Sequence, residues 1–415
     1  MGNLKLHRNS TSNSSLRAAS IRLVLMAGLA LACVAAQAQT FKVLYEFPRG
    51  ADGANPAAGL VRDAAGNLYG TVASGGNTSC YSGCGLVFSL SPAGVETVLY
   101  SFTGTNGDGE YPVAGLLRDA AGDLYGTTQN GGPTGCGILF KLDPSGNETV
   151  LYSFAGGTDG CIPNLGVIQD AEGNLYGATY SGGDSNCTVG GCGVVFKLDK
   201  AGKETILHRF HGRDGAFAGN GFLVWDAAGN LYGTTVAGGD TCPWGSLGCG
   251  VVFRVSKTGK ETVLHKFTGY TDGHAPISGV LRDEAGNLYG TVSGGGDLNC
   301  NYGNGCGVIF KLDKRGKMSQ LYTFKGADGA IPYAGLIQDP AGNFYGTTTQ
   351  GGESGEGTAF VLRKNGKETV LHSFTGDADG YEPNGWLIRD QAGNLYGAAS
   401  NGGTYGGGTV FKITP

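Results

Sequence analysis

Four short apolar segments recur along the chain in a fixed order, and Gly, Asn and Asp residues separate each one from the next. We name them a, b, c and d; in one copy they are residues 114–119, 124–129, 137–142 and 148–154. In segment d polar and apolar positions alternate, so Val98, Tyr100 and Phe102 fall on one face of an extended strand. In segment c apolar residues occupy both faces, as in residues 251–253. The pattern predicts short antiparallel strands in sheets that are buried on both sides.

The four segments form a unit that occurs seven times. The Tyr of segment b marks each copy at spacings of 51 to 57 residues, as Tyr69, Tyr125, Tyr176, Tyr232, Tyr289, Tyr345 and Tyr396. Between a and b lies a turn motif, Asp-x-x-Gly-Asn in six copies, whose Asp can accept backbone hydrogen bonds. Seven four-stranded units with a period of about 54 residues predict an all-β, seven-bladed β-propeller, with a linear solenoid as the alternative.

The two ends of the repeated region favour a closed ring. The region opens with segment d at residues 41–47 and stops after segment c at residues 408–413, so the two incomplete ends add up to one blade. If the first strand pairs with the last, it completes the final blade and leaves no sheet edge exposed. We therefore expect one propeller domain over residues 39–415. The copies vary in length only between b and c, and in a propeller the b–c and d–a loops share one face, the loop face, where we expect function.

Composition and charge narrow the class of protein. The chain has 79 Gly among 415 residues, 40% hydrophobic and 15% charged residues, which excludes both a disordered linker and an ordinary helical enzyme domain. Four of the 29 basic residues and none of the 34 acidic ones lie in the first 38 residues, which leaves a net charge of −9 on the remainder. Such an acidic balance speaks against a nucleic-acid partner.

Residues 1–38 have the pattern of a signal peptide: a basic, Ser-rich start, an apolar run over residues 23–35 and a final Ala-Gln-Ala. Cleavage there predicts a mature chain that begins at Gln39. A lipid on Cys33 is the alternative. Because no other stretch is long and apolar enough to span a bilayer, we expect no transmembrane helix after cleavage. The protein is expected to be exported, and to be secreted, periplasmic or at the cell surface.

Ten cysteines follow the predicted signal peptide. Eight form close pairs inside b–c loops, Cys80 with Cys84, Cys187 with Cys192, Cys242 with Cys249 and Cys300 with Cys306. Their variable spacing and the oxidising compartment favour disulfides over a zinc site. Cys136 lies in a b–c loop and Cys161 in the following d–a loop. These two can pair only if both loops share a face, so a disulfide between them would support the propeller.

Two repeated sets of charged side chains are candidates for ligand binding. An Asp-Gly pair occurs in each d–a loop, at Asp52, Asp108, Asp159, Asp214, Asp272, Asp328 and Asp379. A ring of carboxylates could bind Ca²⁺, for which Asp377 with Asp379 is the best local fragment, but a turn role for Asp-Gly is favoured and no other cofactor is expected. Segment a, which lines the channel of a propeller, has Arg at its penultimate position in four copies, Arg62, Arg118, Arg282 and Arg389. Together they could hold an anion, although pairing with the neighbouring Asp residues is favoured.

A few residues break the repeat. Tyr81, Trp244 and Tyr302 stand at the tips of cystine loops, where rigid aromatic rings could stack on sugars or anchor a protein. The fourth copy is irregular near segment a, where it carries Phe217, Phe222 and Trp225, and we expect these side chains to fill a gap in the ring rather than to form a ligand pocket. No catalytic sequence motif is found. We therefore expect a binding or scaffold module for an extracellular glycan or protein. The alternative is a propeller enzyme, a glycoside hydrolase or lyase acting on polysaccharide, which would need an acid/base pair.

The repeated unit, GNLYGTT…GG…GVVFKL…GKETVLYSF…DG, resembles the GloVer tandem repeat of bacterial exported proteins, in the group of choice-of-anchor tandem repeat GloVer-containing proteins. The resemblance covers residues 41–415. It implies an extracellular repeat protein, often followed by a C-terminal sorting anchor. It supplies no catalytic residues that could be transferred to this sequence.

Overall fold

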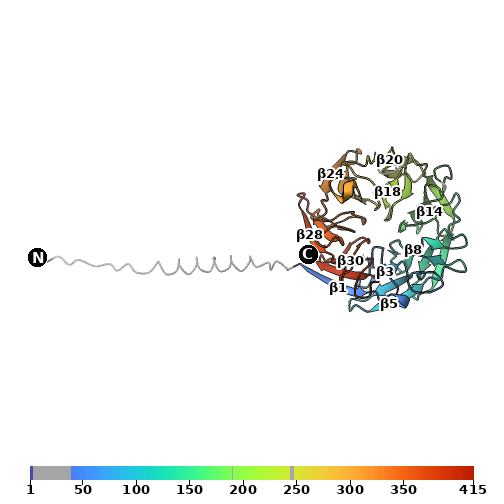
Figure 1. Cartoon of the computed structure of the whole chain (residues 1–415), viewed down its shortest axis with the longest axis horizontal. Helices are drawn as coiled ribbons and strands as arrows, with labels where there is room; N and C mark the ends of the chain where they lie inside the picture. Colours follow the sequence, from blue (N-terminus) through green and yellow to red (C-terminus); the bar gives the residue numbers. More distant parts are fainter. Residues whose placement is uncertain (3–38, 189, 244–246) are drawn as a thin grey trace. The chain divides into compact units, whose positions relative to one another are not determined.

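Each repeat folds into an antiparallel sheet in which strands a, b, c and d follow one another, and seven such sheets surround a central axis (Figure 1). The computed structural model describes residues 1–2, 39–188, 190–243 and 247–415, and this part of the chain contains no α-helix. The sheets belong to one unit, Thr40–Pro415. The predicted seven-bladed β-propeller is confirmed. Apart from Met1 and Gly2, the predicted signal peptide lies outside the described residues.

Strands a and b are the two inner strands of each blade. Strands a, nearest the axis, are β2 (Val61–Arg62), β7 (Leu117–Arg118), β12 (Ile168–Gln169), β17 (Val224–Trp225), β21 (Leu281–Arg282), β25 (Ile337–Gln338) and β29 (Ile388–Arg389). Strands b are β3 (Leu68–Val72), β8 (Leu124–Thr127), β13 (Leu175–Ala178), β18 (Leu231–Ala237), β22 (Leu288–Val292), β26 (Phe344–Thr348) and β30 (Leu395–Ala399).

Strands c and d are the two outer strands of each blade. Strands c are β4 (Leu86–Leu90), β10 (Ile138–Leu142), β14 (Val194–Leu198), β19 (Val251–Val255), β23 (Val308–Leu312), β27 (Thr358–Leu362) and β31 (Thr409–Thr414). Strands d are β5 (Glu96–Ser101), β11 (Glu148–Ser153), β15 (Glu204–Arg209), β20 (Glu261–Lys266), β24 (Met318–Thr323), β28 (Glu368–Ser373) and β1 (Thr40–Glu46). The remaining elements are strands β6 (Gly109–Glu110), β9 (Asn130–Gly131) and β16 (Ala216–Ala218) and the 3-10 turns η1 (Gly50–Asp52) and η2 (Asn301–Gly303).

Strand a is shorter than the sequence predicts. In the second copy it covers Leu117–Arg118 rather than residues 114–119. The residues before it leave the sheet because they line the axis, where the backbone of Gly115 lies against the ring of Phe222. Segment a therefore forms part of the channel wall with its first residues and part of the sheet with its last ones.

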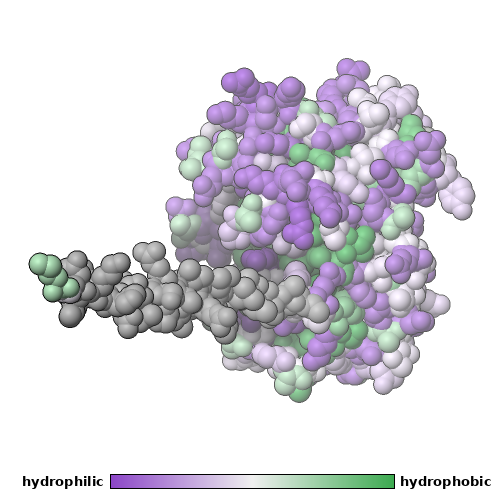
Figure 2. Space-filling model, turned by 90° about the vertical axis from the view of Figure 1, so that its left-hand side faces the viewer, coloured by the Kyte–Doolittle hydropathy of each residue, from purple (hydrophilic) through white to green (hydrophobic). Residues whose placement is uncertain are grey.

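The chain closes the ring with its two ends. Strand β1 pairs with β31 from Thr40 opposite Thr414 to Glu46 opposite Thr409, and β31 pairs on its other side with β30. The last blade therefore takes its outermost strand from the start of the propeller, as the sequence predicts. The outer side of the ring in Figure 2 is mostly hydrophilic, with small groups of hydrophobic residues between the polar ones.

One aromatic pair occurs at every blade boundary. The Phe that ends segment d of one blade meets the Phe of strand c in the next blade edge to face, with ring centroids 5.1 to 5.3 Å apart. The seven pairs are Phe47–Phe88, Phe102–Phe140, Phe154–Phe196, Phe210–Phe253, Phe267–Phe310, Phe324–Phe360 and Phe374–Phe411. All fourteen rings are buried. Each such pair contributes about 1 kcal/mol beyond the area that it buries.

The Gly of the Leu-Tyr-Gly motif makes room for the Phe ring of strand c. A Cβ atom on Gly126 would lie 2.6 Å from the end of the Phe140 ring and 2.9 Å from Leu116. The other six copies have the same crowding at this Gly. A side chain there would push the Phe ring out of the blade boundary, which explains why each copy has Gly after the Tyr.

The Asp-x-x-Gly-Asn turn between strands a and b is held by its own side chains. Asp63 accepts hydrogen bonds from the backbone N and the Nδ2 of Asn67, both at 2.8 Å, and from the hydroxyl of Tyr69 at 3.0 Å. The second copy has Asp123 at the Asn position, and its carboxylate instead pairs with Lys141. The repeated Asp, Asn and Tyr are therefore parts of one turn, which fixes where strand b starts.

We predict that deleting residues 40–47 destabilises the whole ring. The deletion exposes the edge of β31 and removes Phe47 from its contact with Phe88, so we expect a large fall in the thermal unfolding temperature and aggregation. The exposed side chain of Lys42 provides a control, since Lys42→Ala should leave the unfolding temperature unchanged. A deletion variant as stable and as monodisperse as the parent would contradict the closed ring.

Candidate functional site

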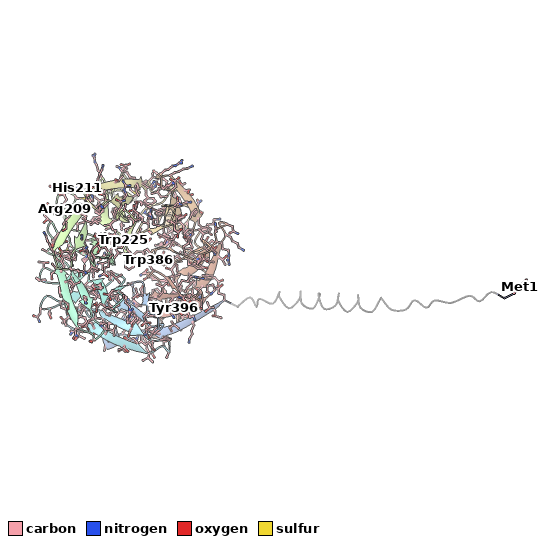
Figure 3. All side chains as sticks on the ribbon, turned by 180° about the vertical axis from the view of Figure 1, so that it is seen from behind. Met1, Arg209, His211, Trp225, Trp386 and Tyr396 are labelled. Carbon is pink, nitrogen blue, oxygen red and sulfur yellow. A yellow bond between two sulfur atoms is a disulfide. The ribbon has the colours of Figure 1, made fainter. Side chains whose placement is uncertain are left out.

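Two residues break a ring of glycines at the axis of the propeller. The position four residues before the turn Asp is occupied, in chain order, by Gly59, Gly115, Gly166, Phe222, Gly279, Gly335 and Trp386. The rings of Phe222 and Trp386 meet edge to face, with centroids 6.0 Å apart and an interplanar angle of 86°. Figure 3 shows Trp386 near the middle of the ring of blades. Because a Cβ atom on Gly166 or Gly335 would overlap one of these rings, the glycines give the two aromatic side chains their space.

The rings of Phe222 and Trp386 block the axis, and we call them the plug. A cavity, which we call the cup, lies next to the plug. The position two residues earlier in each copy carries Ala57, Val113, Asn164, Asn220, Ile277, Tyr333 and Asn384. Its four polar members line a cavity of about 240 Å³, together with Gln129, and Phe222 and Trp386 also line it. These residues lie between the d–a loops and the glycine ring, so the cup opens toward the loop face. Phe222 also lines the separate cavity on the other side of the plug.

Hydrogen bonds between blades hold the walls of the cup. Thr127 of strand β8 donates its hydroxyl to the carbonyls of Pro163 and Leu165, on either side of Asn164. Thr347 of strand β26 donates in the same way to the carbonyl of Pro383, next to Asn384. A Thr of one blade thus positions a wall residue of the next, because strand b lies beside the channel segment of its neighbour.

The polar groups of the cup differ in how they are satisfied. Asn220 donates from Nδ2 to the Tyr333 hydroxyl at 2.9 Å, and Asn384 donates from Nδ2 to Ser400 Oγ at 3.1 Å. Asn164 is only 8% exposed, and its Oδ1 is buried without a hydrogen-bond partner among the described residues. Burial raises the pKa of the Tyr333 phenol, so this group stays neutral and can donate its proton.

The cup is uncharged. None of the described residues that line it is Asp, Glu, His, Lys or Arg. Its chemistry is therefore hydrogen bonding through amides and a phenol, together with contact on the aromatic rings of the plug. The side chains on its wall offer no carboxylate pair or imidazole for general acid/base catalysis.

The four predicted channel Arg residues do not all border one cavity. Arg62, Arg118 and Arg389 border a cavity of about 560 Å³ on the far side of the plug, whereas Arg282 borders a separate hollow. Three of the four guanidinium groups lie over the Tyr of the preceding blade: Arg62 over Tyr396 at 5.7 Å, Arg118 over Tyr69 at 5.4 Å and Arg282 over Tyr232 at 5.7 Å. These contacts give the Arg residues a structural role between blades. An anion site at this mouth stays a prediction.

The predicted disulfide pattern is confirmed in all five pairs: Cys80–Cys84, Cys136–Cys161, Cys187–Cys192, Cys242–Cys249 and Cys300–Cys306. Four of them close short rings inside b–c loops. The bond between Cys136 and Cys161 links a b–c loop to the next d–a loop, as expected when both lie on one face. Disulfides thus fix several loops of the loop face.

The aromatic residues at the loop tips lie away from the cup. Tyr81 is 106% exposed and Tyr302 is 104% exposed, and neither lines the cup. Trp244 lies outside the described residues. The structure therefore does not bring Tyr81 and Tyr302 into one enclosed site, and their role in binding stays a prediction.

A small polar cluster, which we call a corner, recurs beside strand d. In each corner the carboxylate of the Asp-Gly pair lies next to a Tyr or His side chain of strand d. Asp379 accepts hydrogen bonds from His372 Nε2 at 2.9 Å and from the backbone N and hydroxyl of Thr375. These bonds support the turn role of Asp-Gly. Asp377 does not join Asp379 in a three-residue group of metal-ligating atoms, and the one such group among the described residues is His208, Asp214 and Glu261. Calcium at Asp377 and Asp379 stays a prediction.

Five corners also contain a Glu from the start of strand d in the next blade. They are Tyr45–Asp52–Glu96, Tyr100–Asp108–Glu148, Tyr152–Asp159–Glu204, His208–Asp214–Glu261 and Tyr322–Asp328–Glu368. In all five, Oε1 of the Glu is buried without a hydrogen-bond partner among the described residues. Burial, and to a lesser degree the neighbouring Asp, raises the pKa of each Glu to about 7. The cluster around His208 is thus one version of a repeated corner in which four copies have Tyr.

Comparison with known proteins identifies the repeat. The sequence profile of the Gloeobacter/Verrucomicrobia repeat matches residues 30–190, 81–304 and 241–415, which together cover most of the chain. The chain belongs to this family. No curated protein matches the GloVer chain in sequence. Among the residues that the structure describes, no helix has the length and apolar character needed to cross a membrane.

Solved structures share the propeller fold with this GloVer chain. The extracellular domain of a protein assigned as a one-component system of B. thetaiotaomicron has a TM-score of 0.55 at 12% identity, over 89% of this chain and 39% of that one. A Bacteroides uniformis protein assigned as a 6-phosphogluconolactonase has a TM-score of 0.51 at 17% identity, over 80% and 89% of the two chains. A fungal alcohol oxidase of the AA5 family, solved with copper, has a TM-score of 0.56 at 15% identity, over 91% and 76%. At such identities the likeness shows the fold alone.

The cup of the GloVer propeller was not predicted from the sequence. Phe217, Phe222 and Trp225 were expected to fill a gap in the ring rather than to form a pocket. Of these three, Phe222 packs against Trp386 at the axis and also lines the cup, whereas Phe217 stacks on Tyr180 and Trp225 is exposed; the role of Trp386 was overlooked. The signal was available, because Phe222 and Trp386 both replace Gly at one aligned position and three of the polar wall residues are Asn at another. That these positions face the axis only becomes clear once the blades are arranged around it.

We predict that the GloVer ring is more stable in mild acid than at neutral pH. A Glu whose pKa is raised in the folded state binds its proton more tightly there than in the unfolded chain. The stability it contributes is complete below its ordinary pKa of 4.5 and is lost as the pH rises to about 7. Urea unfolding should therefore show a free energy of unfolding that falls between pH 5 and pH 8.

Glu204→Gln tests this dependence at one corner. Because Gln stays uncharged at all pH values, the variant should lose less stability than the parent between pH 5 and pH 8. The exposed Glu284 of an a–b turn serves as the control, and Glu284→Gln should keep the slope of the parent. Equal slopes for the parent and Glu204→Gln would show that the corner Glu is already ionised in mild acid.

Proposed function

We propose that this GloVer propeller is an exported binding module that recognises an extracellular glycan through the cup on its loop face. One observation carries the proposal: the repeat is broken at the axis by a set of amides, a phenol and two aromatic rings that line one cavity. Binding pockets combine apolar rings with a few convergent polar groups in this manner. The repeated parts of the blades, by contrast, are explained by the fold.

The side chains of the cup suit a sugar. Amide groups both donate and accept hydrogen bonds, as sugar hydroxyls do, and the apolar faces of sugar rings pack against aromatic side chains. Asn220, Asn384 and Tyr333 supply the first kind of group, and Phe222 and Trp386 supply the second. A protein partner would need a larger apolar contact than a cavity of about 240 Å³ provides.

Export is supported by the cysteines and by the predicted signal peptide. Ten of the eleven cysteines form disulfides, which persist in oxidising compartments and are rare in the cytosol.

The alternative function is cleavage of a polysaccharide. Hydrolysis of a glycosidic bond ordinarily uses two carboxyl groups on either side of the bond. The described residues of the cup include none, which favours binding over catalysis at this site. Turnover of a polysaccharide that depends on a carboxylate elsewhere on the loop face would establish the enzyme instead.

A glycan array with the full-length exported protein tests the proposal, with Trp386→Gly as the key variant. Five other blades have Gly at this position, so the variant restores the repeat and should fold, while the cup loses half of its floor. We expect binding to at least one class of glycan, weakened about 10-fold by the substitution. Tyr405→Ala, at an exposed loop aromatic that does not line the cup, is the control.

Two results would contradict the proposed site. If no glycan on the array binds, glycan recognition itself is wrong. If a glycan binds and Trp386→Gly has no effect while Tyr81→Ala or Tyr302→Ala abolishes binding, the contact lies at the loop tips instead of the cup. Thermal unfolding of each variant must match the parent for the comparison to count.

A further inference from the structure

The plug decides how a glycan can approach the axis. The rings of Phe222 and Trp386 lie edge to face across the channel, and the backbone of the glycine ring closes around them. A chain that enters from the loop face therefore meets a floor and cannot thread through to the other mouth. Only the end of a chain, or a side branch, fits such a site.

The size of the cup points in the same direction. Its volume of about 240 Å³ is below the range of roughly 300 to 1,000 Å³ that is typical of pockets for larger ligands. One sugar ring fits a space of this size, with the next unit outside the mouth. An extended run of sugars would need a groove across the loop face.

The buried amide of Asn164 defines what the sugar must offer. Asn164 lines the cavity, and its Oδ1 is buried behind the wall without a partner among the described residues. A buried amide is costly unless it is hydrogen-bonded, and a hydrogen bond between the Asn164 side chain and a ligand hydroxyl would offset part of this cost. Thr127 holds the backbone on both sides of Asn164, so this residue is held in place before the ligand arrives.

The absence of charge in the described wall selects against acidic sugars. A carboxylate or sulfate in the cup would leave water without finding Arg, Lys or His among the described lining residues. Burying an unpaired charge carries a high free-energy cost. Three of the Arg residues near the propeller axis lie beyond the plug, where they border the opposite cavity.

We propose that the cup holds one uncharged sugar at the end of a glycan chain or branch, and that Asn164 is a specificity-determining residue whose side-chain amide forms a hydrogen bond with a hydroxyl of that sugar. This inference rests on the proposed glycan-binding function and goes further by naming the end of the chain as the epitope. The protein then recognises the ends of glycan chains, so the amount of protein bound depends on the number of chain ends rather than on the length of the polymer.

The test uses methyl glycosides of neutral hexoses and of N-acetylhexosamines as competitors of the glycan selected on the array, with methyl glucuronide as the charged comparison. We expect at least one neutral glycoside to compete and the glucuronide not to compete. Asn164→Asp, which replaces the amide with a charged group of the same shape, should weaken binding about 10-fold or more. Asn365→Asp adds the same charge at an exposed c–d turn and should leave the affinity unchanged.

A second variant keeps the test decisive if Asn164→Asp does not fold. Asn220→Ala removes the amide that donates to Tyr333, and it should also weaken binding by several-fold while the thermal unfolding temperature stays near that of the parent.

The inference is overturned if the selected glycan binds well but neither cup variant affects it, or if long unbranched chains with blocked ends bind as tightly as free ones. The proposed function survives both of these results. An array without any bound glycan would overturn the two proposals together.

Discussion

The edge-to-face contact between two Phe rings at every blade boundary holds the ring of blades together, and most other features of the fold follow from it. The contact joins the outermost segment of one blade, segment d, to strand c of the next blade. Its seven copies have nearly the same geometry. A ring requires every boundary to turn the chain by the same angle, and identical aromatic contacts meet this requirement. The Gly after each repeated Tyr follows from the same contact, because the Phe140 ring and its counterparts occupy the space of a side chain. Much of the repeat is thus explained by the need to place one ring correctly.

A ring with equivalent blades has a consequence for function. Residues at one aligned position converge on the axis from all seven copies, so a substitution in one or two copies is enough to build a site there. Gly at five of seven axial positions leaves the space that Phe222 and Trp386 fill. The same holds for the wall above them, where Asn164, Asn220, Asn384 and Tyr333 share the aligned position with apolar residues of the other copies. The fold brings the aligned positions of all copies together at the axis, and the residues that differ from the repeat provide the polar and aromatic groups there.

The sequence predicted the parts of this structure that depend on order along the chain. Alternation and turn motifs indicated the strands, the incomplete ends indicated the pairing of β1 with β31, and cysteine spacing indicated the disulfides. It predicted less where residues from distant copies meet. Strand a was expected to be longer, because nothing in a single copy shows that residues near Gly115 must line a channel. Tyr81 and Tyr302 stood out as large exposed aromatics, whereas the cup consists of ordinary Asn residues whose meaning depends on facing one another across the axis.

The departures from the repeat at the axis matter most if they form a site for the end of a neutral glycan. A crystal structure of the full exported protein with the oligosaccharide selected on the array tests this directly. We expect density for one terminal sugar above Phe222 and Trp386, with a hydroxyl within hydrogen-bond distance of the Asn164 side-chain amide and the rest of the chain leaving through the loop face. Density for the sugar at Tyr81 or Tyr302, or beside Arg62 at the opposite mouth, with the cup filled by water alone, would contradict it.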